Sequence, residues 1–165
     1  MQNNHIIGGE FDVDLQSFQC IKSNNDSLEG VYKYSSGRSA LYYILLDVQK
    51  RYGITTVYFP DYLCSSVVMA AQKCQMKVVF YNLNDQLEID AERFPMPSEA
   101  KVAVLLINYF GLKNLEQQVA FVRSISKNAI IIEDDVQAFY EFQKKELIAD
   151  YKFTSLRKTF ACPDG

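Results

Sequence analysis

The apolar and polar residues of this chain follow two alternating periods, one helical and one typical of buried strands. Apolar residues three or four positions apart predict helices over residues 37–51, 65–74 and 115–125, with a single helical turn over 90–94. Short apolar runs rich in β-branched residues predict strands over 55–59, 77–81, 102–107, 129–132 and 151–155. Such alternation is typical of a three-layer α/β domain with a mostly parallel sheet.

Polar residues follow several of the predicted strands. Asp61 and Tyr62 come after the strand over 55–59, Asn108 after the run over 102–107, and Glu133 and Asp134 after the run over 129–132. Ligands of open parallel sheets bind outside the carboxyl ends of the strands. We therefore expect a binding site at this edge of the sheet.

The start of the first predicted helix has the composition of an anion site. Ser35 or Ser36 can cap this helix, and Gly37, Arg38 and Ser39 follow. Free backbone N–H groups at a helix start attract anions, and an arginine there adds a charge-assisted contact to a phosphate. The alternative is an ordinary capped helix start without a ligand.

An acidic stretch ends the predicted strand over 129–132. Strand residues point alternately to opposite faces, so Glu133 and Asp134 cannot both face one ligand. If the ligand is an aromatic ring with a protonated nitrogen, Asp134 is the better partner for that nitrogen, and Gln137 lies within reach of an oxygen on the same ring. The alternative is a solvated acidic turn.

Lys158 follows the last predicted strand and precedes the apolar residues 160–162. An apolar cover would lower the pKa of its amine and make it nucleophilic. An amine and a strand-end carboxylate placed in this way suit a covalently held pyridoxal cofactor. The alternative is a solvated surface lysine.

Composition narrows the remaining choices. The chain has 165 residues, 48% of them hydrophobic, which fits one domain with a sizeable core. A net charge of −3 with interspersed signs argues against nucleic acids and anionic membrane surfaces as partners. One histidine and four scattered cysteines make neither a zinc set nor a catalytic triad, so we expect no metal. Unpaired thiols and the lack of a long apolar run favour a protein of the reducing cytoplasm.

Four segments occur in the order found in a known family. They are residues 36–41 (SGRSAL), 108–111 (NYFG), 132–138 (IEDDVQA) and 158–165 (KTFACPDG). Over residues 6–165 the chain resembles the DegT/DnrJ/EryC1/StrS family of pyridoxal-phosphate-dependent sugar aminotransferases. The resemblance implies the large domain of the fold-type I transferases, in truncated form.

The resemblance also implies roles for individual residues. Lys158 corresponds to the Schiff-base lysine, and the residues implied to bind the cofactor are Asp134, Gln137, Gly37, Arg38, Ser39, Tyr62 and Ser155. Three features depart from the family. Arg38 stands where a small residue such as threonine is usual, and the spacing from Ser155 to Lys158 is short. Cys64 occupies the place of the ring-stacking aromatic, for which Tyr62 is the substitute.

By this resemblance the protein transfers an amino group from a small donor to the keto group of a nucleotide-linked sugar, as a homodimer. Residues 1–165 are then the N-terminal cofactor-binding part, and the small C-terminal domain is absent. We expect this fragment alone to be inactive. One alternative is an inactive remnant that folds and self-associates. Another is a small nucleotide-binding domain, against which the absence of GxGxxG and GxxxxGK[ST] argues.

Overall fold

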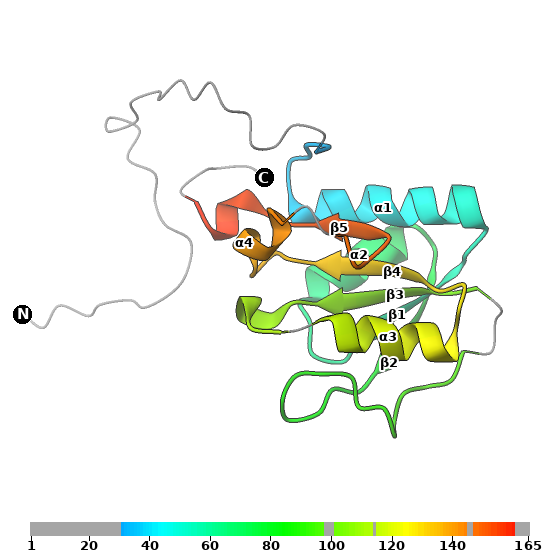
Figure 1. The fold of residues 1–165 in the computed structure, drawn as a ribbon. Coiled ribbons are helices and arrows are strands. Elements are labelled where there is room, and N and C mark those ends of the chain that lie inside the picture. The colour runs from blue at the N-terminus through cyan, green and yellow to red at the C-terminus, as the bar shows by residue number, and fades with distance from the viewer. Residues whose placement is uncertain (1–30, 98–100, 114, 145–146, 161–165) are drawn as a thin grey trace, which may run out of the picture.

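The computed structural model describes residues 31–97, 101–113, 115–144 and 147–160. Five parallel strands form one sheet in the order β2-β1-β3-β4-β5 (Figure 1). The strands are β1 (Thr56–Pro60), β2 (Lys77–Tyr81), β3 (Ala103–Ile107), β4 (Ile130–Asp134) and β5 (Tyr151–Phe153). The predicted α/β domain is confirmed, and its five strands are all parallel.

Helices cover both faces of the sheet, which makes the predicted three layers. The helices α1 (Gly37–Tyr52) and α2 (Ser65–Lys73) pack on one face, and α3 (Leu115–Ile125) packs on the other (Figure 1). Three short segments follow strands: η1 (Tyr109–Gly111), α4 (Phe139–Phe142) and η2 (Leu156–Lys158). None of the helices in the described part of the chain is long and apolar enough to cross a membrane.

The ends of α1 are set by its sequence. Ser36 has an extended backbone and its side chain accepts a hydrogen bond from the Ser39 N–H at 3.2 Å, which caps the helix. Leu41, Leu45 and Val48 form the fully buried face. Gly53 then adopts a left-handed conformation with φ 68° and ends the helix. The predicted helix is confirmed.

The central strands are buried on both sides, as their continuous apolar runs predicted. Every residue of β1 and β4 is buried, whereas the edge strand β2 leaves Phe80 half exposed. Two strand ends differ from the prediction. The last strand stops at Phe153 instead of residue 155, and β4 continues through Glu133 and Asp134, which pair with Leu106 and Ile107 of β3. Asp134 is therefore held in the ladder as the last residue of the strand.

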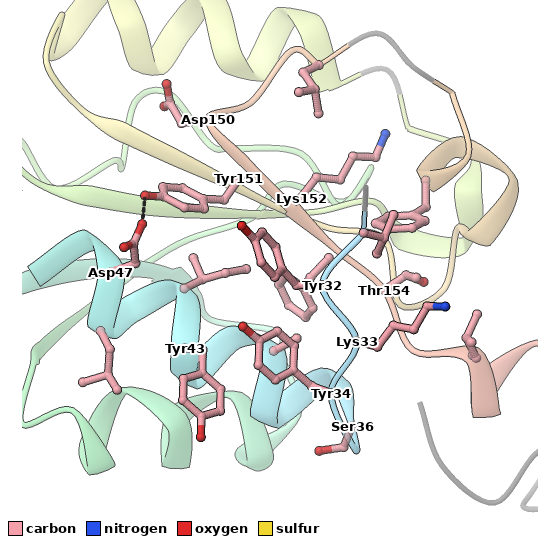
Figure 2. Close-up of a pocket in the computed structure, with 18 of the residues that line it drawn as sticks. Tyr32, Lys33, Tyr34, Ser36, Tyr43, Asp47, Asp150, Tyr151, Lys152 and Thr154 are labelled. Atoms are coloured by element: carbon pink, nitrogen blue, oxygen red, sulfur yellow. Dashed lines mark hydrogen bonds between the residues drawn. The ribbon is translucent and has the colours of Figure 1, made fainter. Parts of the chain in front are cut away.

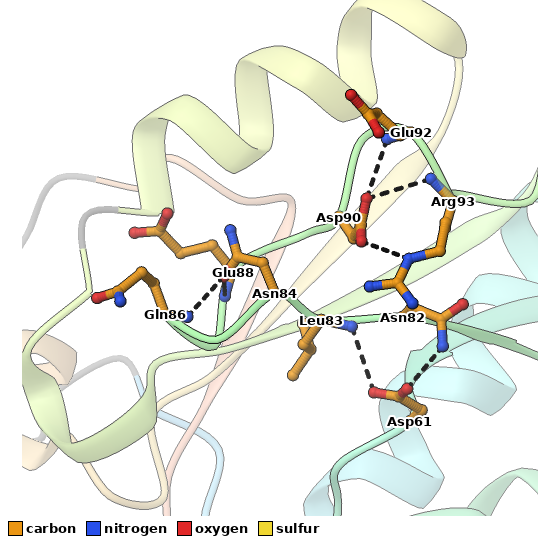
Figure 3. A network of polar contacts seen from close by, with 9 residues as sticks. All are labelled: Asp61, Asn82, Leu83, Asn84, Gln86, Glu88, Asp90, Glu92 and Arg93. Carbon is orange, nitrogen blue, oxygen red and sulfur yellow. Dashed lines mark hydrogen bonds and ion pairs between the residues drawn. The ribbon is translucent and has the colours of Figure 1, made fainter.

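The predicted helical turn over 90–94 is an isolated turn held by side chains (Figure 3). The Asp90 carboxylate accepts hydrogen bonds from the backbone N–H groups of Glu92 and Arg93 at 3.1 and 3.2 Å. In the same network, Asp61 accepts hydrogen bonds from the Asn82 amide and the Leu83 N–H. Asp61, which we had placed at the candidate edge, therefore anchors the segment after β2.

The buried leucines of β3 should carry much of the stability of this domain. Leu105 is fully buried, while Leu112 is 81% exposed just beyond the same strand. We expect Leu105→Ala to lower the free energy of unfolding by about 2–5 kcal/mol, because it leaves a cavity in the core. Leu112→Ala should change it by less than about 0.5 kcal/mol. Urea unfolding of both variants checks this, and equal effects would contradict the packing described.

Candidate functional site

The start of α1 lies directly against the ends of β4 and β5. Gly37 is buried, and a Cβ atom there would lie 3.3 Å from both Ser155 Cβ and Val136 Cγ2 and 3.6 Å from the Thr154 carbonyl oxygen. This contact leaves almost no room for a side chain at position 37. The structure thus brings together the predicted residues Gly37 and Ser155 and the segment that follows Asp134.

Three serine hydroxyls surround this helix start. Ser36 Oγ lies 3.0 Å and Ser35 Oγ lies 3.3 Å from Ser39 Oγ. Hydroxyls beside the N-terminus of a 16-residue helix form an arrangement that can hold an anion. Arg38 is exposed, and its guanidinium lies 4.0 Å from Met69 Sδ of α2, so it extends along α2.

Asp134 is a buried acid at the end of β4. Its side chain lies on the α1 side of the sheet, because Ile130 and Ile132, at alternate positions of the strand, pack in that core. Its Oδ1 accepts the Val136 N–H at 2.9 Å, and Oδ2 accepts no hydrogen bond from the described residues. Desolvation raises the pKa of Asp134 to about 7; the Val136 N–H opposes this rise and the Asp135 charge adds to it. One oxygen of the Asp134 carboxyl group is therefore left for a hydrogen-bond partner.

Tyr109 lies near Asp134, and no separate sequence signal indicated its role. Its hydroxyl donates to the Tyr62 carbonyl, and the two rings are 5.9 Å apart. Burial raises the pKa of Tyr109 above its ordinary value, and the charges of Asp134 and Asp61 raise it further. Tyr62 itself is 61% exposed. The only sequence clue to Tyr109 was the position of the 108–111 segment at the end of a predicted strand.

Gln137 connects the segment after β4 to η1. Its Oε1 accepts the Phe110 N–H at 3.2 Å, and its side chain is exposed. Phe110 has a left-handed backbone, with φ 60° and ψ 12°, which costs about 1–2 kcal/mol in a non-glycine residue. Local strain of this kind is common beside binding sites. Gln137 is therefore positioned by the loop after β3.

Lys158 lies on η2 and is exposed. It is near Cys64: hydrogen bonds from Ser66 lower the pKa of that thiol most, and the charges of Lys158 and Arg38 lower it further. The expected apolar cover is missing from the described residues, because Phe160 packs edge-on against the Phe139 ring at 4.8 Å. Residues 161–162 of the predicted cover lie outside the described residues. The described surroundings therefore leave the Lys158 amine in water.

A cavity lies beside this site. It has a volume of about 1050 Å³ and runs between α1 and the outer edge of β5, lined in part by Tyr32 and Tyr34 (Figure 2). Asp47 of α1 and the Tyr151 hydroxyl of β5 face it and form a 2.6 Å hydrogen bond. Of the candidate region, Ser36, Thr154 and Leu156 also line this cavity. Asp134 and Lys158 do not, so the cavity is separate from their chemistry.

Solved structures share this fold. The PLP form of a putative sugar aminotransferase, Spr1654 from Streptococcus pneumoniae, matches with a TM-score of 0.59 and 18% identity over 73% of this chain and 36% of that one. The sugar aminotransferase CalS13 from Micromonospora echinospora matches with a TM-score of 0.54 and 15% identity over 64% of this chain and 30% of that one. The E. coli GDP-4-keto-6-deoxy-D-mannose-3-dehydratase with bound hydrated PLP matches with a TM-score of 0.53 and 18% identity over 65% of this chain and 29% of that one.

This chain shares the three-layer fold of part of each of these structures. It covers well under half the length of each of these structures. No family model and no curated protein matches the sequence. The TM-scores of 0.53–0.59 establish a shared fold, and at identities of 15–18% the chemistry of this chain has to be argued from its own residues.

The raised pKa of Asp134 makes stability depend on pH. A carboxyl whose pKa rises from 3.8 to about 7 on folding stabilises the protein below pH 4, and this contribution is lost as the pH rises through 7. At 1.36 kcal/mol per unit the loss is at most about 4 kcal/mol. We expect Asp134→Asn to be more stable than the parent chain at pH 8 and similar to it at pH 4.

Urea unfolding across this pH range measures the effect. Glu116→Gln, on the exposed side of α3, is the control and should leave the pH profile unchanged. An Asp134→Asn profile that parallels the parent profile would show that Asp134 is ionised at ordinary pH without cost.

Proposed function

We propose that this chain is the cofactor-binding part of a pyridoxal-phosphate-dependent aminotransferase of the DegT/DnrJ/EryC1/StrS type. Its acceptor is the keto group of a nucleotide-linked sugar, and its donor is a small amine such as an amino acid. The observation that carries the proposal is the buried Asp134 carboxylate, one oxygen of which is left for a donor beside a hydroxyl-lined helix start. The PLP-containing neighbours of the same fold support it.

The residues fit the two ends of this cofactor. Asp134 Oδ2 would accept the N–H of the ring nitrogen, and the ionised carboxylate would stabilise the positive charge of a protonated ring. When bound, the ring withdraws electrons from the carbon that loses a proton. The Ser39 hydroxyl and the backbone amides near Gly37 would hold the phosphate, with Ser155 and Arg38 beside them.

The remaining residues would act around the ring. The Lys158 amine would bond to the cofactor and, once displaced by the donor, move the proton at the reacting carbon. Tyr62, or Cys64 in the place of the usual aromatic, would cover the ring face. Gln137 would contact the ring oxygen from the strand-end loop, where Phe110 already fixes its position. We propose that the protein is a homodimer in which a second copy of the chain completes the site. We also propose that it is located in the cytoplasm.

One observation favours a second candidate. Lys158 is exposed, whereas a nucleophilic lysine needs a pKa lowered by burial or by a neighbouring cation. The alternative is therefore a folded protein that self-associates without turnover. Transamination assays with amino donors and nucleotide-linked keto sugars separate the two. Turnover that disappears in Lys158→Ala supports the enzyme. Absence of turnover favours the alternative, and turnover that Lys158→Ala retains contradicts the role proposed for Lys158.

Lys158 should be the point of covalent attachment. Incubation with pyridoxal phosphate, borohydride reduction and peptide mass spectrometry should locate the adduct on the peptide that contains Lys158. We expect Lys158→Ala to abolish the adduct and Lys127→Ala to retain it. Lys127 is an exposed lysine near the amino ends of the strands, opposite the candidate site. Equal labelling of several exposed lysines, unchanged in Lys158→Ala, would contradict the assignment.

Gly37 should be needed for cofactor binding more than for folding. Because a methyl group there lies 3.3 Å from Ser155 and Val136, Gly37→Ala should move the helix start and weaken pyridoxal phosphate binding about tenfold, or ~1.4 kcal/mol. Fluorescence titration measures this affinity. The control is Gly53→Ala at the other end of α1. That substitution meets no atom within 4 Å, and it should cost about 1 kcal/mol of stability through its left-handed backbone and leave the affinity unchanged.

A further inference from the structure

A buried group of charges lies on the other side of β4 from Asp134. Glu133 and Asp135 point to that side, where Lys152 of β5 meets both. The Lys152 ammonium lies 3.4 Å from Asp135 Oδ2 and 3.8 Å from Glu133 Oε1, and all three side chains are at least 93% buried. We call Glu133, Asp135 and Lys152 the acid–lysine cluster.

The cluster has too many negative charges and too few donors if both acids are ionised. Lys152 also donates to the Glu141 carbonyl at 2.8 Å, and the Asn108 amide donates to Asp135 Oδ1 at 3.2 Å. Glu133 Oε2 and Asp135 Oδ2 are then buried without a hydrogen-bond partner among the described residues. Buried acceptors in this state destabilise the folded protein, and more so when they are charged.

Other charges near the cluster do not relieve this imbalance. Glu141 of α4 adds a further negative charge, and it is paired with Lys144 at 2.6 Å. Asp134 is the next residue along the strand and is also acidic. One ammonium therefore faces two buried carboxylates, and Glu141 and Asp134 nearby are also acidic.

We propose that Glu133 is a neutral carboxylic acid whose hydroxyl donates a hydrogen bond to Asp135, so that Asp135 and Lys152 remain as one balanced ion pair. Oxygens of the two carboxyl groups lie 3.8 and 3.4 Å from the same Lys152 ammonium, which places the two groups next to each other. A single proton gives both orphaned oxygens a partner and makes the cluster neutral. Burial raises the pKa of Glu133 to about 7, and the Asp135 charge raises it further while Lys152 opposes the rise.

Glu133 is in this view a positioning residue. Asp135, which it satisfies, joins three strand ends: its N–H donates to the Phe153 carbonyl, its carbonyl accepts the Thr154 hydroxyl, and its side chain accepts from Asn108. These contacts hold the ends of β4 and β5, from which Asp134 and Ser155 project. The consequence for cofactor binding rests on the proposed function, whereas the shared proton does not.

The proton can be observed directly in the unmodified, cofactor-free chain. Selective ¹³C labelling of glutamate carboxyls separates Glu133 from Asp134 in infrared spectra. We expect one glutamic acid C=O band at about pH 6, where ordinary glutamates are ionised. It should disappear with a midpoint near the pKa of about 7. No such band, or a band that remains in Glu133→Gln, overturns the proposal.

Two variants test the positioning role without cofactor. Glu133→Gln keeps an N–H donor for Asp135 and should fold with a thermal midpoint close to that of the parent chain. Glu133→Leu removes the donor and should lower the midpoint clearly at pH 6, where Glu133 of the parent chain is protonated. Equal loss in both variants would overturn the donor role. Should neither fold, the labelled band of the parent chain still decides the protonation state, and failure of cofactor binding would leave both readouts unaffected.

Discussion

The close approach of Gly37 to Ser155 and Val136 is the contact on which the candidate site depends. It places the N-terminus of α1 at the ends of β4 and β5, with no side chain in between. Parallel strands direct their carboxyl ends to one edge, and a helix that begins there adds its free N–H groups to the same place. The anion-binding and acid halves of the proposed site are thus joined by backbone geometry, and burial of Leu41 and Leu45 keeps the helix in that position.

The three consecutive acids at 133–135 show how a single strand end can serve two environments. Alternation sends Asp134 toward α1, where one oxygen is left for a donor, and sends Glu133 and Asp135 toward Lys152. Removing one partner from such a buried group is costly, while the intact group contributes little net stability. Its value lies in fixing the ladder end that carries Asp134, so the conformation of the site depends on charges that never face a ligand.

Much of this arrangement could be predicted from the sequence, because burial leaves a periodic trace. The runs over 102–107 and 129–132 indicated strands buried on both faces, and Ser36 with Leu41 and Val48 indicated a capped helix. The extension of β4 through Asp134 could not be predicted, since two acids end the apolar run although they stay in the ladder. The burial of Lys152 could not be predicted for a similar reason. A lysine in a strand is normally solvated, and its burial depends on two acids nineteen and seventeen residues away.

The parts of the proposed site differ in how well they are ordered before a ligand binds. Asp134, Gly37 and Ser39 are already held by packing and hydrogen bonds. This order lowers the entropic cost of binding a ligand that combines an anion with a ring that donates a hydrogen bond to an acid. Lys158 is exposed, on a short 3₁₀ segment near Cys64. A nucleophilic lysine needs desolvation, and a bound ring that covers the Lys158 side chain would supply it.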